Sequence, residues 1–108
     1  MGITKTEGFS EKINTLAEIF KVLGHPARLS ILEFLLKQKS CICNDIVNEI
    51  PLAQPTISRH LAEMKRVGII KGSIDGKNIN YCLNPDIIQE VGIYFNKLVI
   101  NVPKNDCC

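Results

Sequence analysis

The strongest pattern of apolar and polar positions in the chain lies near its middle, over Gln54–Gly68. Ile57, Leu61 and Met64 recur at i, i+4 and i+7, which places them on one stripe of a helix. Polar and charged residues fill the rest of the circumference. Pro55 suits the start of a helix, where a proline loses no hydrogen bond. The pattern predicts a helix that packs through one face and leaves the other open to a partner.

A second short helix is predicted just upstream, over residues 44–50, where three apolar positions share one face. Pro51 breaks this segment before Gln54. Two short helices joined by a tight turn form the helix-turn-helix of DNA-binding proteins, in which the second helix enters the major groove. We therefore predict a helix-turn-helix over residues 44–68.

Two longer segments, residues 9–23 and 86–102, carry apolar residues at alternating spacings of three and four. Ser10 is a plausible cap for the first helix, and Asn84 for the second. Either seam alone could equally face its own core. Two-fold symmetric DNA-binding proteins place two reading helices about one DNA turn apart, and this favours seams that pair two copies of the chain.

The remaining segments complete the pattern. The segment that begins at His25 is apolar around so much of its circumference that we expect it to be the most buried helix. Residues 69–83 alternate as two strands around a strong Asp-Gly turn signal, which predicts a β-hairpin wing. We expect residues 1–8 to form a loose arm and residues 103–108 a tail.

The predicted fold is one domain over residues 1–108, mainly α with a small β-hairpin. The element order is α-α-α-α-β-β-α, which is a winged helix-turn-helix. With 108 residues, 45% of them hydrophobic and 22% charged, the chain is long enough for one modest core. It has no run of about 20 apolar residues and no signal-peptide pattern, so we expect a cytoplasmic protein with no membrane partner.

The distribution of charge supports nucleic-acid binding better than the net charge of +2 does. Between Gln54 and Asn80 there are five basic residues and two acidic ones, whereas the rest of the chain has eight and nine. The basic surplus therefore coincides with the predicted reading helix and wing. Taken alone, such a surplus would also fit an ordinary solvated face.

The five cysteines are an odd count in a chain with no export signal, so reduced thiols explain them better than a disulfide framework. Cys41 and Cys43 form a C-x-C on the approach to the predicted helix 44–50, where helix amides favour the thiolate. Thiolates select thiophilic ions such as As(III), Sb(III), Hg(II), Cu(I) or Cd(II). Cys82 is better explained as a strand residue than as a ligand.

A C-x-C supplies two of the three thiolates that a pyramidal As(III) takes, and a tail with two cysteines could reach it with the third. The predicted metal ligands are Cys41, Cys43, Cys107 and Cys108. Two alternatives remain open at this point. The tail cysteines could be an inert chain end, or the thiols could form a redox switch that oxidises to a disulfide.

Three stretches of this sequence resemble the ArsR/SmtB family of winged-helix repressors. FKVLGHPARLSILEFLL resembles the family's opening, QPTISRHLAEMKRVGII its recognition segment and IDGKNINYCLNP its wing. The resemblance covers Phe20–Pro85 without a gap. It implies a homodimer that binds a palindromic operator when free of inducer and leaves the operator when an inducer binds.

The resemblance also bears on the inducer. One class of family site uses His and carboxylate ligands on the last helix, but residues 85–102 contain no histidine. Another uses Cys-Val-Cys-Asp-Leu to bind arsenite, antimonite, cadmium or lead, and SCICNDI is similar to it. Here Asn44 separates Cys43 from Asp45, so the thiols stand one residue earlier than in the family pattern.

The polar face of the Gln54–Gly68 helix supplies most of the residues that we predict to contact DNA. Side chains in the groove would read base edges, and cations beside it would bind phosphate, which gives affinity without sequence information. Those predicted to enter the major groove are Gln54, Thr56, Ser58, Arg59 and His60. Those predicted to contact phosphate are Lys65, Arg66, Lys71 and Lys77. The best candidates for base contacts are Gln54, Ser58 and Arg59.

The sequence therefore predicts a DNA-binding repressor, with operator DNA and a second copy as its partners. We expect no permanently bound cofactor and release by As(III), Sb(III) or another thiophilic ion. No catalytic motif is recognisable, so an enzyme is not expected. The alternatives are a thiol redox sensor, a ligand-independent winged-helix regulator or RNA-binding module, and a thiol-based metal carrier.

Overall fold

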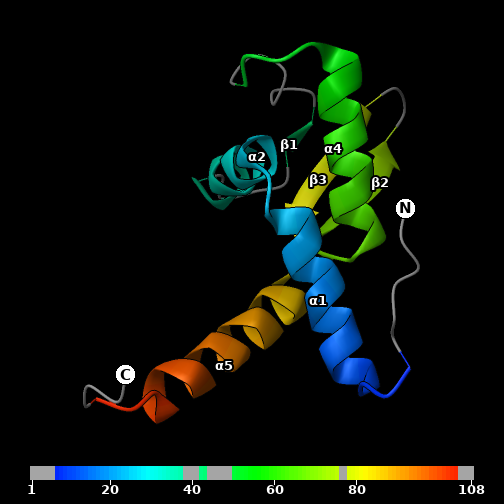
Figure 1. Ribbon diagram of the computed structural model, residues 1–108. Helices are drawn as coiled ribbons and strands as arrows, with labels where there is room; N and C mark the ends of the chain where they lie inside the picture. The colour runs from blue at the N-terminus through cyan, green and yellow to red at the C-terminus, as the bar shows by residue number, and fades with distance from the viewer. Residues whose placement is uncertain (1–6, 38–41, 44–49, 76–77, 105–108) are drawn as a thin grey trace.

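The computed structural model describes residues 7–37, 42–43, 50–75 and 78–104, and Figure 1 shows their arrangement. Of the helix predicted over residues 44–50, all but Ile50 lies outside these residues, as do most of the N-terminal arm and of the tail. The elements are α1 (Glu11–Leu23), α2 (Pro26–Lys37), β1 (Ile42–Cys43), α4 (Gln54–Arg66), β2 (Ile70–Asp75), β3 (Asn78–Leu83) and α5 (Pro85–Asn101).

Local sequence signals account for where the helices begin. The Ser10 side chain accepts a hydrogen bond from the Ile13 amide at 3.1 Å, which caps α1 as predicted. The Asn84 side chain does the same for α5 through the Asp86 amide at 3.1 Å. α4 has Ala53 at its N-cap position and no side-chain cap, so it depends on the proline in its first turn.

The hairpin predicted over residues 69–83 is confirmed as β2 and β3, which pair antiparallel with Gly72 opposite Tyr81. The sheet also has a third strand that the sequence did not predict. β1 pairs antiparallel with the other edge of β3, with Ile42 opposite Tyr81 and Cys43 opposite Asn80, so the strand order is β1-β3-β2. Ile42 and Cys43 of the C-x-C motif therefore lie in a strand of the wing sheet.

The core lies where α1, α2 and α4 meet the start of the hairpin (Figure 1). The fully buried side chains are Ile19, Val22, Ile31, Ile57, Met64, Ile69 and Ile70. The prediction that α2 is the most buried helix is wrong. It buries Ile31 and Leu35, whereas Leu36 is 71% exposed, because one small core can cover only one side of so apolar a helix.

The end of α4 is joined by hydrogen bonds to the start of α5. The Ile69 amide donates to the Met64 carbonyl at 3.0 Å, and the Asn84 amide donates to the Ile69 carbonyl at 2.9 Å. The Asn84 side chain also donates to the Gly68 carbonyl at 2.9 Å. Gly68 has φ +84°, a left-handed conformation that favours glycine, and an added Cβ would lie 3.5 Å from Ile87. One short junction thus connects α4, the wing and α5.

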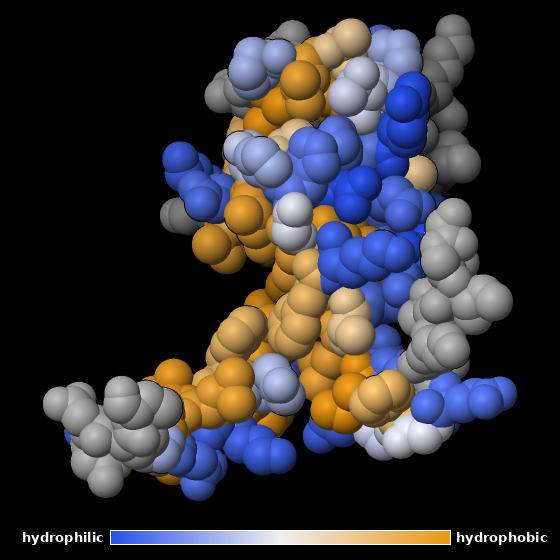
Figure 2. All heavy atoms as spheres, in the orientation of Figure 1, coloured by the Kyte–Doolittle hydropathy of each residue, from blue (hydrophilic) through white to orange (hydrophobic). Residues whose placement is uncertain are grey.

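α5 projects away from the core and buries none of its residues. Within the chain its packing includes ring contacts of Phe20 with Tyr94 and Phe95, whose centroids are 5.7 and 5.3 Å away. Its exposed large apolar side chains are Ile88, Ile93, Phe95, Leu98, Val99 and Ile100. Figure 2 shows apolar side chains gathered along α5 and the adjoining part of α1. Within the described ranges, no helix is long and apolar enough to cross a membrane.

Candidate nucleic-acid interface

α4 has two distinct faces. Ile57, Leu61 and Met64 are buried against the core, which confirms the apolar stripe predicted from the sequence. The opposite side is exposed to solvent and polar, and Figure 2 shows polar side chains gathering over this part of the molecule. A helix that is fixed by one face and polar on the other has the geometry of a major-groove reader.

Most residues predicted to contact DNA lie on accessible surface. Thr56 is half-buried, at the edge of the outer face. Lys77 lies outside the described residues. The predicted contacts that are exposed are Gln54, Ser58, Arg59, Lys65, Arg66 and Lys71. The three best base-edge candidates and the two lysines Lys65 and Lys71 are therefore all accessible to a duplex.

Arg66 is less available to phosphate than predicted. Its Nη2 lies 3.1 Å from the Glu63 carboxylate on α4 and 3.2 Å from the Glu18 carboxylate on α1. The hydrogen bond from Arg66 holds the pKa of Glu63 below its ordinary value. Exposed ion pairs of this kind contribute little to stability, but here two carboxylates already share the guanidinium charge. Arg66 therefore links α1 to the reading helix.

The prediction that His60 contacts DNA is not supported by its position, because His60 is only 9% exposed and faces inward. Its Nδ1 accepts a hydrogen bond from Nε of Arg28 at 3.1 Å. Position 60 is i+3 from Ile57, so the helical spacing itself places it on the apolar stripe. Its polar identity, rather than its spacing, led to the wrong assignment.

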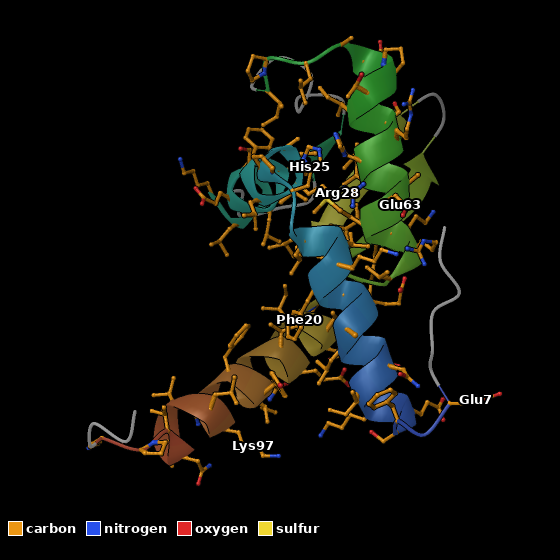
Figure 3. The ribbon with its side chains drawn as sticks, viewed as in Figure 1. Glu7, Phe20, His25, Arg28, Glu63 and Lys97 are labelled. Carbon is orange, nitrogen blue, oxygen red and sulfur yellow. The ribbon has the colours of Figure 1, made fainter. Side chains whose placement is uncertain are left out.

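His25 and Arg28 stand where α2 begins, beside α4 (Figure 3). The His25 ring lies 4.5 Å from the His60 ring, centroid to centroid, and its Nδ1 accepts a hydrogen bond from the Ala27 amide at 3.1 Å. His25 thus caps the start of α2 and packs against His60. The sequence prediction did not single out Arg28, which joins the start of α2 to the inner face of α4.

The four predicted metal ligands are placed only in part. Cys43 belongs to β1, but its side chain is outside the described set, and Cys41, Cys107 and Cys108 lie outside the described residues altogether. Among the residues that are described, no group of three or more His, Cys, Asp or Glu side chains could hold a metal ion. The proposed ligand set therefore stays a prediction.

The prediction that Cys82 is a strand residue is confirmed, but it is not a reduced thiol. It lies half-buried on β3, the strand that β1 joins, and it is disulfide-bonded. The expectation of reduced thiols therefore fails at this position. The strand that carries Cys82 is also the one that β1, some forty residues earlier in the chain, joins through Ile42 and Cys43.

Comparison with known proteins agrees with this geometry. Residues 25–71 match the family model described as bacterial regulatory protein, arsR family. The chain is 42% identical over 82 residues to an HTH-type transcriptional regulator of Methanocaldococcus jannaschii, covering 75% of this chain and 91% of that protein. This chain belongs to the ArsR family. The resemblance seen in the sequence is confirmed, and the protein is an ArsR-family DNA-binding regulator of transcription rather than an enzyme.

Two further comparisons extend the assignment. The arsenical resistance operon repressor of Escherichia coli is 35% identical over 71 residues, which cover 65% of this chain and 60% of that protein. A crystal structure of an ArsR family transcriptional regulator superposes with a TM-score of 0.74 at 16% identity, covering 87% of this chain and 96% of that one. The ArsR-type winged-helix fold is thus shared well beyond the range of close sequence similarity.

Replacing Arg59 with Ala should weaken binding to the preferred DNA site by about 1–3 kcal/mol and relax its sequence preference, because a side chain predicted to contact base edges would be lost. Lys71→Ala is the matched control on the wing and should weaken all duplexes alike, with a smaller dependence on salt. Fluorescence anisotropy with specific and scrambled duplexes measures both effects. Unchanged affinity and preference in Arg59→Ala would remove this residue from the reading set.

Proposed function

We propose that this ArsR-family protein is a cytoplasmic homodimeric repressor whose C-x-C thiolates, from Cys41 and Cys43, bind As(III), Sb(III) or another thiophilic ion and thereby release operator DNA. The observation that carries the proposal is the pairing of β1 with β3, which makes the C-x-C segment part of the wing sheet. A change at the thiols would therefore act on an element that is connected directly to the DNA-binding surface.

The C-x-C motif is connected to the DNA-binding surface in two ways, across the sheet and along the chain. Across the sheet, β3 pairs along its whole length with β2, and β2 begins four residues after the end of α4. Along the chain, the residues after Cys43 lead into α4 itself. An ion that draws sulfur atoms together would move β1 relative to β3, which would change how the wing and the reading helix lie against DNA.

The energetic requirement for such a switch is modest for thiolate chemistry. Moving an equilibrium from 1:99 to 99:1 needs a ligand that favours the released state by about 5.5 kcal/mol. The C-x-C would supply two sulfur ligands and the tail a third, from Cys107 or Cys108 of either protomer. The E. coli relative is named for arsenical resistance, which favours As(III) as the first ion to test.

The exposed apolar face of α5 supports the dimer. Leu98 is 47% exposed and Val99 is 70% exposed, on a helix that buries no residue within its own chain. Contiguous apolar surface of this kind marks interaction sites in soluble proteins. Pairing of two such helices would place two copies of α4 on one DNA duplex, as the palindromic operators of two-fold symmetric regulators require.

A DNA-binding titration tests the proposed function directly. A duplex selected from a random library by the protein is titrated in reducing buffer, alone and with arsenite, cadmium or zinc. We expect arsenite or cadmium to release the duplex, and zinc to have less effect because zinc is a less thiophilic ion. Tight binding that no ion changes would contradict the inducer assignment and support a ligand-independent regulator.

A second candidate, redox control, is favoured by the disulfide at Cys82. Oxidation would then restrain the wing sheet through the disulfide, and reduction would remove that restraint. The variant Cys82→Ser distinguishes the two candidate functions. Under the metalloid proposal this variant still releases DNA on adding arsenite, whereas under redox control it no longer distinguishes oxidising from reducing buffer.

A further inference from the structure

We infer that Arg28 and His60 form a positioning pair that holds the reading helix α4 in its DNA-binding orientation, and that the pair holds only while His60 is uncharged. The inference depends on DNA binding by α4 but not on the proposed inducer. It concerns residues on the inner side of α4, opposite the face that would meet DNA.

The Arg28 guanidinium connects three helices. Its Nη1 donates to the carbonyl of Val22 near the end of α1 at 3.1 Å, and its Nε donates to Nδ1 of His60 on α4 at 3.1 Å. Both bonds are partly buried, so water competes for them less than at the surface. The planar guanidinium fixes both directions at once, which sets the angle of α4 relative to α1 and α2.

The bond to His60 requires one particular protonation state. Nδ1 can accept from Arg28 only if it carries no proton, which leaves the ring neutral with its hydrogen on Nε2. The imidazolium form has hydrogen on both nitrogens, so the Nε–H of Arg28 would then face an N–H instead of a lone pair. Two cations would also stand at hydrogen-bond distance in a partly buried site.

The surroundings of His60 reinforce this preference. Burial lowers its pKa below the ordinary value of 6.5, and the positive charges of His25, Arg28 and Arg59 lower it further. Glu63 interacts electrostatically with Arg28 but is hydrogen-bonded to Arg66. Among the described residues, no carboxylate raises the pKa of His60.

The sign of the pH effect follows from the lowered pKa. The unfolded chain takes up the proton near pH 6.5, whereas the folded domain takes it up only at lower pH. The stabilisation of the fold by neutral His60 is therefore fully present above pH 6.5, and it is lost as the pH falls toward the lowered pKa. If DNA binds only the neutral form, affinity halves at that pKa and then falls up to about tenfold for each further pH unit.

The test is the pH dependence of DNA affinity in the full chain, measured from pH 7.5 to 5.0 at constant ionic strength, under reducing conditions and without added ions. The probe is a duplex selected by the wild-type protein at pH 7.5. We expect wild-type affinity to fall over this range. His60→Asn keeps an acceptor near the position of Nδ1 but does not titrate, so its affinity should stay constant, whatever its value at pH 7.5.

The chain has two histidines, so His25→Asn is the matched control. The asparagine Oδ1 of this variant can still accept a hydrogen bond from the Ala27 amide. Removing the charge of the His25 ring should raise the pKa of His60, so the fall in affinity should move to slightly higher pH without disappearing. Arg28→Ala should weaken binding and flatten the pH dependence, and adding His60→Asn to it should have little further effect, because both changes remove the same contact.

A spectroscopic readout separates positioning from simple stability. Histidine ¹⁵N resonances report directly whether Nδ1 of His60 is unprotonated, and we expect this state at pH 7.5 in the wild type and in His25→Asn. The inference is overturned if wild-type affinity does not change with pH, if His60→Asn loses affinity as steeply as the wild type, or if Nδ1 carries the proton at pH 7.5. These measurements use no added ion. Failure of the proposed arsenite response would therefore not change any of the three expected results.

Discussion

Cys43→Ser is expected to bind operator DNA as the wild type does and to stay bound when arsenite is added. Serine nearly matches cysteine in size and keeps the backbone pairing of β1 with β3, but its hydroxyl is not a soft ligand. Release needs about 5.5 kcal/mol of preference for the released state, and loss of one of few sulfur ligands should remove most of it. Anisotropy of a labelled duplex, titrated with arsenite in reducing buffer, measures the result.

Cys82→Ser is the matched control for this prediction, because it makes the same exchange on the neighbouring strand. Under the metalloid proposal it should release DNA at the arsenite concentration that releases the wild type. Normal release by Cys43→Ser would remove the C-x-C from the inducer site. Loss of release in both variants would instead indicate that the sheet between them has to be intact for any response.

Met64→Ala should lower the free energy of unfolding by about 2–5 kcal/mol, since it removes a fully buried side chain and leaves a cavity that the core cannot fill. This is a large part of the stability of a domain of this size. Met64 lies on the inner face of the reading helix, so DNA affinity should fall at temperatures where the folded state is no longer fully populated. Urea unfolding followed by circular dichroism measures the loss.

Ser58→Ala is the control on the same helix, because the Ser58 side chain is exposed to solvent. Its free energy of unfolding should stay within about 0.5 kcal/mol of the wild type. If Met64→Ala were as mild as Ser58→Ala, the inner face of α4 could not be packed as described.

The features that the sequence predicted well depend on residues close together in the chain. The apolar stripe of α4, the Ser10 and Asn84 caps and the hairpin all follow from spacings of a few residues, and the structure confirms them. The DNA-binding family was predictable for a related reason, because its three signatures occur in order along one continuous stretch.

The features that were missed depend on contacts between distant parts of the chain. β1 has two residues, too few to show any period, and it is defined only by pairing with β3 about forty positions later. The hydrogen-bond partner of His60 is Arg28, 32 residues away in the chain, and no local sequence pattern predicts that contact. The burial of α2 was overestimated because periodicity reports which residues are apolar, but not how much core is available to cover them.

The hydrogen-bonded junction at Gly68 and Asn84 has a consequence for the kind of operator this protein can read. α4 is tied at its C-terminal end to the first turn of α5, and α5 carries the apolar face proposed for dimerisation. In that dimer, the separation of the two reading helices depends on the angle at this junction in each protomer. The half-site spacing that such a dimer accepts would therefore be set by residues outside the predicted DNA contacts.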